Sequence, residues 1–267
     1  MSRLQSCFVE LKKTGRKALI PYIVGGDPQK DSTVSQMHAM VAAGADVIEL
    51  GVPFSDPMAE GPVIQLAHER ALEHHTSLSD ILAMVAEFRQ KDSNTPVVLM
   101  GYLNPVEVMG YALFAERAEA AGVDAVLTVD LPPEESAGLK AELVGKGIDS
   151  IFLIAPTTTE ARIKKICDSA SGYIYYVSLK GVTGASHLDV AEVSEKLALI
   201  RQHSSLPLSV GFGIKDAESA KAIGAMADGV VVGSALVNAY LEGSQKPDWN
   251  AAQPPALIQS IRAALDE

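Results

Sequence analysis

The chain has little cysteine: Cys7 and Cys167 are the only two among its 267 residues. Neither belongs to a CxxC pair or has a histidine at the spacing of a metal site, which excludes a disulfide-rich scaffold and a zinc module. Two unpaired thiols are typical of the reducing cytoplasm, where we expect this protein to work. The sequence also lacks the apolar core of a signal peptide and any uncharged apolar run long enough to span a bilayer.

Positive charge is scarce as well. The chain has 22 Lys and Arg against 33 Asp and Glu, which gives a net charge of −11. Nucleic-acid binding requires clustered Lys and Arg, so we exclude a nucleic-acid partner. A small anionic substrate stays open, because backbone N–H groups and helix N-termini can hold phosphate in an acidic protein. With 48% hydrophobic and 21% charged residues, the chain is expected to fold around a large core.

Short apolar runs recur along the whole chain. They lie at 18–24, 47–50, 97–100, 125–129, 151–154, 173–177, 206–210 and 230–232. The runs are continuous rather than alternating, which is typical of parallel strands that are buried on both faces. Stretches with helical periodicity separate them, and the clearest is the apolar stripe over 78–88.

Eight successive strand–helix units predict a (β/α)8 barrel, with residues 1–267 forming one domain. A doubly wound sheet is the competing architecture. It normally has a G-x-G-x-x-G turn after its first strand, where this chain has only Gly25-Gly26. Additional helices are expected before the first strand, around Leu4, Phe8 and Leu11, and as a consecutive pair between the second and third strands, at 63–72 and 78–88.

Glycines follow three consecutive predicted strands near the end of the chain. They occur in Gly181-Val182-Thr183-Gly184, in Gly211-Phe212-Gly213 and in Gly233-Ser234. A single pair of this kind is more often a tight turn. Three such sites at neighbouring strand ends, with a helix beginning near Ser234, predict that this part of the barrel binds phosphate.

Acidic residues cluster around the second predicted strand. Glu49 lies inside the apolar run, so burial should raise its pKa towards the working pH and suit it to general acid/base chemistry. The alternative is a structural Glu that is satisfied by a neighbouring Tyr or a backbone group. Asp56 and Glu60 follow in the loop, where Asp56 could serve only to initiate a turn.

Tyrosines and histidines give weaker signals. Tyr173 and Tyr175 share one face of the sixth strand, where tyrosines more often pack than react. The histidines in helical or loop regions, His68, His74, His75 and His187, have no ligand-like spacing, so we assign no metal.

Six segments in this order together resemble the tryptophan synthase alpha subunit family. They are Ile48–Pro57, Met100–Pro105, Asp130–Glu135, Tyr175–Ser178, Gly181–Gly184 and Gly211–Ile214. The resemblance runs from the first expected helix to the last. It implies a barrel lyase of tryptophan biosynthesis, which splits indole-3-glycerol phosphate by a retro-aldol reaction into indole and glyceraldehyde 3-phosphate without a cofactor.

The resemblance also implies residue roles. Glu49 would be the acid/base at the indole ring, Glu60 would bind the indole N–H, and Tyr175 would lie beside the reacting groups. Phosphate would be held by the loops with Thr183, Gly184, Gly213, Gly233 and Ser234. The indole slot would be lined by Tyr22, Ile64, Met100, Leu127, Val129, Leu153 and Phe212. The family usually has Asp where this chain has Glu60, and we expect the loop backbone to retreat so that Glu60 keeps its role.

The resemblance further implies a partner, a pyridoxal-phosphate beta subunit that receives indole through a tunnel in an alpha-beta-beta-alpha heterotetramer. We expect the exposed loops at Asp56-Pro57, Asn104-Pro105 and Pro132-Pro133 to form the docking surface, although they could be simple turns. The composition of 180–190 is that of a lid, which we expect to close over substrate with Thr183 bonded to Asp56.

Two rival functions are compatible with much of the sequence. One is another phosphate-binding barrel enzyme, such as an isomerase of an indole or sugar phosphate. It would lack the PFSDP loop and would usually need a basic residue at a strand end, for which Lys180 is the only nearby candidate. The other is a catalytically weak alpha-type subunit that mainly activates a beta subunit, which the change at Glu60 keeps open.

Overall fold

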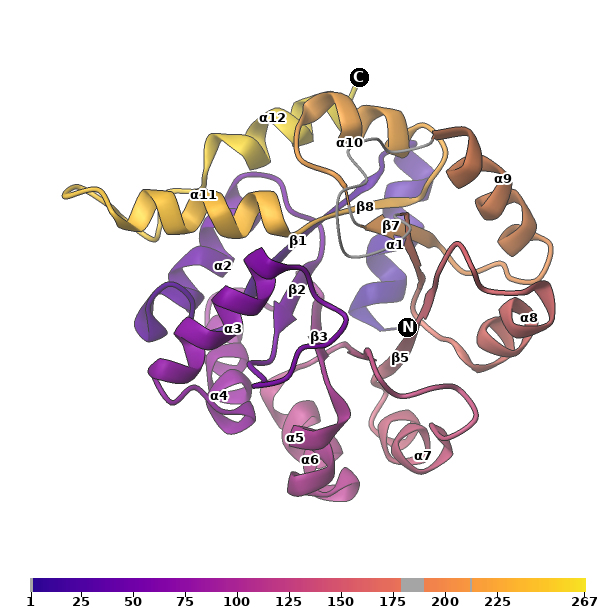
Figure 1. Cartoon of the computed structure of the whole chain (residues 1–267), viewed down its shortest axis with the longest axis horizontal. Coiled ribbons are helices and arrows are strands. Elements are labelled where there is room, and N and C mark those ends of the chain that lie inside the picture. Colours follow the sequence, from indigo (N-terminus) through magenta and orange to yellow (C-terminus); the bar gives the residue numbers. More distant parts are fainter. Residues whose placement is uncertain (1, 179–189, 212) are drawn as a thin grey trace.

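Parallel strands form a closed barrel in the computed structural model, which describes residues 2–178, 190–211 and 213–267 (Figure 1). Each strand pairs with the next in sequence, and β8 pairs with β1. The strands are β1 (Ala18–Val24), β2 (Ile48–Gly51), β3 (Val97–Gly101), β4 (Ala125–Thr128), β5 (Asp149–Ile154), β6 (Ile174–Val177), β7 (Leu208–Gly211) and β8 (Gly229–Val232). The predicted (β/α)8 barrel is confirmed.

Helices surround this barrel (Figure 1). They are α1 (Arg3–Thr14), α2 (Thr33–Ala42), α3 (Pro62–Glu73), α4 (Leu78–Arg89), α5 (Leu103–Met109), α6 (Tyr111–Ala121), α7 (Ala137–Gly145), α8 (Glu160–Ser169), α9 (Val190–Arg201), α10 (Ala217–Gly224), α11 (Ser234–Ser244) and α12 (Ala256–Leu265), with a short 3₁₀ turn at Lys30–Ser32. The expected helix before β1 is α1, and the expected pair between β2 and β3 is α3 and α4. Among the described residues, no helix is long and apolar enough to cross a membrane.

Burial explains why apolar and polar residues do not alternate along the strands. Every residue of β1, β2, β7 and β8 is buried, because one face of each strand points into the barrel and the other lies under helices. The barrel interior is packed by its own side chains, as in other barrels of this type. The end at which the strands finish is hollowed by a cavity.

Helix α1 covers the opposite end of the barrel, where the strands begin. Ser2 starts it by accepting a hydrogen bond from the Gln5 N–H, and Gly15 ends it in the left-handed conformation, with φ of 71°. Its buried residues Leu4 and Phe8 belong to the same apolar cluster as the barrel interior. The helix therefore closes this end with apolar side chains and keeps water from the part of the barrel interior next to it.

An ionic network at the same end ties the helices to the strand starts. The buried Asp124 carboxylate accepts hydrogen bonds from Arg89 at 2.7 Å, from Arg3 at 2.9 Å and from the Val97 N–H at 2.8 Å. One carboxylate thus joins α1, α4 and the first residue of β3.

Two expectations for exposed loops were wrong. Asn104 and Pro105 lie in the first turn of α5 rather than in a loop. Proline fits there because the first N–H groups of a helix have no intrahelical partner, so its missing N–H costs little. Pro57 is buried, whereas its neighbours Asp56 and Met58 are exposed.

Candidate active site

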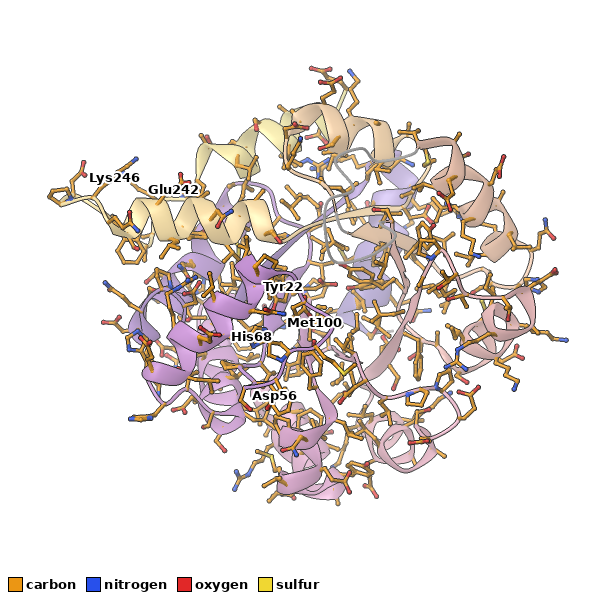
Figure 2. The ribbon with its side chains drawn as sticks, in the orientation of Figure 1. Tyr22, Asp56, His68, Met100, Glu242 and Lys246 are labelled. Carbon is orange, nitrogen blue, oxygen red and sulfur yellow. The ribbon has the colours of Figure 1, made fainter. Side chains whose placement is uncertain are left out.

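A cavity of about 420 Å³ opens at the carboxyl ends of the strands, mostly between apolar walls. Its lining includes these predicted site residues: Tyr22, Glu60, Ile64, Met100, Val129, Leu153, Tyr175, Gly213, Gly233 and Ser234. In Figure 2, Tyr22 and Met100 lie together near the centre of the barrel. Residues that are far apart in the sequence therefore meet at one site because the barrel closes.

The other predicted residues are placed differently. Glu49 and Leu127 are fully buried in the barrel interior and do not line the cavity. Leu127 packs in the same apolar cluster as Tyr22 and Met100. Thr183, Gly184 and Phe212 lie outside the described residues, as do residues 180–189 of the predicted lid.

Glu49 is held on β2 by backbone pairing with Tyr22 on β1 and Val98 on β3. Its side chain is 0% exposed, the Tyr173 hydroxyl donates a hydrogen bond to Oε1, and Oε2 has no partner among the residues that the structure describes. Burial raises the pKa of Glu49 to about 8, although the Tyr173 hydrogen bond opposes the shift and nearby Glu60 adds to it. At neutral pH this carboxyl is therefore mostly protonated and can donate a proton.

Tyr173 supplies the contact with a neighbouring tyrosine that the structural alternative for Glu49 named, although the sequence analysis did not identify which tyrosine it would be. It was expected only to pack, and it does pack against Phe8, with ring centroids 5.7 Å apart. Its hydroxyl, however, is the one hydrogen-bond partner found for the Glu49 side chain among the described residues. The sequence offered one signal for this contact. Tyr173 shares a strand face with Tyr175, and that face points into the barrel interior, where Glu49 also lies.

Glu60 comes from the loop between β2 and α3 and lines the cavity. Its side chain is 5% exposed, and burial raises its pKa to about 7. Its backbone carbonyl accepts a hydrogen bond from the Gln65 side chain at 2.8 Å, and the neighbouring Ala59 N–H donates to the Tyr102 hydroxyl at 3.1 Å. The loop is therefore fixed on both sides of this carboxyl.

Tyr175 forms part of the cavity wall and is 3% exposed. Its backbone pairs with Leu153 on β5 and Ser209 on β7. A Cβ added at Gly211 would collide with the Tyr175 hydroxyl. Glycine at that position leaves room for the tyrosine ring beside the cavity.

Another part of the cavity wall contains the start of α11. Gly233 precedes the helix, and Ser234 is its first residue. Gly213 adopts a φ of 78°, which glycine tolerates and other residues rarely adopt. Lys215 also lines the cavity. This wall therefore favours an anionic group, because it combines the N-terminus of α11, the Ser234 hydroxyl, the glycine backbone and the Lys215 amine.

The fold and this site define the class of protein: an α/β-barrel enzyme whose site lies at the carboxyl ends of its strands. The family model described as tryptophan synthase alpha chain matches residues 8–265. The chain belongs to this family.

Curated relatives and solved structures agree with the assignment. The chain is 62% identical to the tryptophan synthase alpha chain of Thioalkalivibrio sulfidiphilus over 266 residues, with 100% of both chains covered. It is 58% identical to that of Nitrosococcus oceani, covering 100% of this chain and 98% of the relative. A crystal structure of tryptophan synthase subunit alpha from Legionella pneumophila str. Paris is similar with a TM-score of 0.92 at 47% identity, covering 100% of this chain and 99% of the other.

Family membership confirms the activity that the resemblance implied. The chain is a carbon–carbon lyase of tryptophan biosynthesis, which cleaves indole-3-glycerol phosphate. Membership also implies a beta-subunit partner.

Proposed function

We propose that the cavity at the carboxyl ends of the strands holds indole-3-glycerol phosphate, with Glu49 as the acid/base and Glu60 as the acceptor for the indole N–H. Tyr175 forms the wall beside the reacting groups. The observation that carries this proposal is that one buried carboxyl, Glu60, lines the cavity while a second, Glu49, lies in the barrel interior among the same strands, and burial raises their pKa values to about 7 and about 8. Carboxyls that titrate near neutral pH are suited to proton transfer.

The retro-aldol reaction sets three demands on the site. Ring carbon C3 must gain a proton, positive charge on the ring nitrogen must be stabilised, and the hydroxyl of the side-chain carbon attached to C3 must lose a proton. The bond from C3 to that carbon then breaks, and its electron pair returns to the ring. Glu49 is protonated at neutral pH and can supply the first proton, after which its carboxylate can take the hydroxyl proton.

Glu60 serves the nitrogen in this scheme. The hydrogen bond from the ring N–H to an ionised carboxylate becomes stronger as positive charge develops on the ring nitrogen. It therefore stabilises the transition state more than the bound substrate. The apolar walls formed by Ile64, Met100, Val129 and Leu153 suit the flat indole ring.

Glu49 must move to reach the substrate, because its carboxyl does not line the cavity. One hydrogen bond from Tyr173 holds it at rest, and no other described residue bonds its second oxygen. A side-chain rotation therefore breaks a single hydrogen bond, a net loss of about 1 kcal/mol. We infer that substrate binding brings this rotation about.

The phosphate of the substrate lies at the wall that contains the start of α11 in this proposal, against Gly213, Gly233 and Ser234. The N-terminal dipole of α11 favours the negative charge, and the Ser234 hydroxyl adds a donor. Thr183, Gly184 and Phe212 stay predicted substrate contacts, and Leu127 supports the slot from the barrel interior.

Indole release from indole-3-glycerol phosphate by purified Glu60→Asp, Glu60→Ala and native protein tests these roles. General acid–base and positioning groups each contribute on the order of 10²-fold or more. We expect Glu60→Ala to lose about 10² in turnover and Glu60→Asp to keep most of it. Native-like turnover by Glu60→Ala would contradict the role of Glu60.

We further infer that a beta subunit docks on the face formed by the loop after β2, α5 and the loop after β4. Met58, beside Asp56 and Pro57, is 80% exposed, and Val108 on α5 is 81% exposed. Val108 is one helical turn from Asn104, so both lie on the same helix face. Large apolar side chains that are this exposed are available for contact with a partner.

The stoichiometry that we propose for this assembly is alpha-beta-beta-alpha. Pro132, in the loop after β4, would contribute to the same face. We infer that residues 1–267 act as one domain in the cytoplasm, which the free thiols of Cys7 and Cys167 support.

A further inference from the structure

The loop between β2 and α3, residues 52–61, contains Glu60 and is bonded to the helix that follows it. The Phe54 N–H donates a hydrogen bond to His68 Nδ1 at 3.0 Å. The Gln65 side chain donates to the Glu60 carbonyl at 2.8 Å. His68 and Gln65 both belong to α3, so these two contacts join the loop to the next element in the sequence.

Tyr102 contacts the same loop from a different strand. It follows the last residue of β3 and directly precedes α5. Its hydroxyl accepts a hydrogen bond from the Ala59 N–H at 3.1 Å. Its ring stacks on Phe54, with ring centroids 5.2 Å apart and an angle of 23° between the ring planes. One side chain therefore holds the loop near both of its ends.

The position of Tyr102 is fixed independently of the loop. Its side chain is buried, and its backbone continues β3. The N–H of the next residue, Leu103, donates a hydrogen bond to Asp130 Oδ1 at 2.8 Å, which ties this point to the loop after β4. The tyrosine can therefore hold the Glu60 loop against the barrel, because it belongs to the barrel and not to the loop.

The placement of Glu60 depends on the backbone that Tyr102 bonds. Asp56, Met58 and Ala59 are exposed, whereas the Glu60 side chain is almost fully buried at the cavity. Ala59 directly precedes Glu60, so its hydrogen bond to Tyr102 fixes the point from which the Glu60 side chain enters the cavity wall. A displacement of about 1 Å at a reacting group can lower the rate by about 10².

We propose that Tyr102 is a positioning residue for the lyase reaction: its ring and its hydroxyl hold the loop so that the Glu60 carboxyl faces the substrate. This inference rests on the proposed role of Glu60. Tyr102 is not part of the cavity wall that the described residues form, so it acts through the loop and not on the substrate.

Indole release by Tyr102→Phe, alone and combined with Glu60→Ala, tests the proposal. Tyr102→Phe keeps the ring and removes the hydroxyl, so we expect kcat/KM to fall about tenfold, the value of one hydrogen bond. Tyr102→Leu also removes the ring stack, and we expect a loss of about 10². A residue that acts only through Glu60 has no further effect when Glu60 is absent. Tyr102→Phe should therefore leave the activity of Glu60→Ala unchanged.

Two controls separate positioning from general damage to the fold. Tyr240→Phe removes another buried hydroxyl, one without a partner among the described residues, and is expected to keep native kcat/KM. The affinity of Tyr102→Phe for glycerol 3-phosphate is expected to stay within about twofold of the native value, because the proposed phosphate wall at the start of α11 is unchanged. A loss of this affinity as large as the loss of kcat/KM would contradict positioning of Glu60.

The outcomes distinguish this proposal from the function on which it rests. Native-like turnover by Glu60→Ala would overturn the role of Glu60, and the positioning role with it. If Glu60→Ala loses turnover while folded Tyr102→Phe keeps native kcat/KM, the positioning role alone is wrong. It is also wrong if Tyr102→Phe still lowers kcat/KM tenfold in the Glu60→Ala protein.

Discussion

Glu49 should make the protein less stable as pH rises, and Glu49→Gln should remove this effect. The pKa of Glu49 is raised from its usual 4.5 to about 8 in the folded protein. Folding therefore favours the protonated carboxyl. The contribution of Glu49 to stability is fully present below pH 4.5, is lost as pH rises from 4.5 to about 8, and changes no further above that. A glutamine, which does not titrate, has no such dependence.

The size of the effect follows from the same pKa values. A difference of about 3.5 pKa units corresponds to at most about 5 kcal/mol, at about 1.4 kcal/mol per unit. Glutamine keeps an oxygen that can accept the Tyr173 hydrogen bond, so the contact survives the substitution. We expect Glu49→Gln to gain stability relative to the native chain by several kcal/mol between pH 4.5 and pH 8.5.

Urea unfolding of both proteins at a series of pH values measures this difference directly. Both proteins are compared at the same pH, so the contributions of all other titrating groups to the free energy of unfolding largely cancel in the difference. A stability difference that stays constant between pH 4.5 and pH 8.5 would refute the reasoning, because it would mean that Glu49 titrates alike in the folded and unfolded chains.

Three further substitutions test other parts of the structure. Ser234→Ala should raise KM for indole-3-glycerol phosphate about tenfold with a smaller effect on kcat, since a hydroxyl donor to phosphate is lost; an unchanged KM would contradict phosphate binding there. Met58→Asp should weaken binding of a beta subunit at least about tenfold by calorimetry, whereas Val144→Asp, at a 63% exposed site on α7, should not. Equal effects would place the interface elsewhere. Asp124→Ala should lower the free energy of unfolding by about 3 kcal/mol, because Arg89 loses a buried partner; a loss below 1 kcal/mol would contradict that role.

The strands could be predicted closely because burial on both faces produces continuous apolar runs. The run at 18–24 coincides with β1, and 97–100 falls one residue short of the end of β3. The helix pair between β2 and β3 was also predictable, from the apolar stripe over 78–88 and the proline that starts α3. These signals are local, so the sequence alone contains them.

Contacts across the barrel could not be predicted in the same way. Tyr173 meets Glu49 only because β6 and β2 face each other across a closed interior, and no spacing in the sequence encodes that distance. His68 showed a weaker signal, since it shares the buried face of α3 with Ile64 and Ala71 and thus had to find polar partners. The prediction of a loop at Asn104-Pro105 was wrong because proline suits both a turn and the first turn of a helix.

The claim on which the mechanism depends most is that the Glu49 carboxyl transfers protons to and from the substrate. Turnover of indole-3-glycerol phosphate by Glu49→Gln, with the affinity for glycerol 3-phosphate measured on the same preparation, tests it most directly. We predict that turnover falls by 10² to 10⁴, the range for a general acid–base group, while affinity stays within about twofold of the native value. Turnover within tenfold of the native protein would contradict the mechanism.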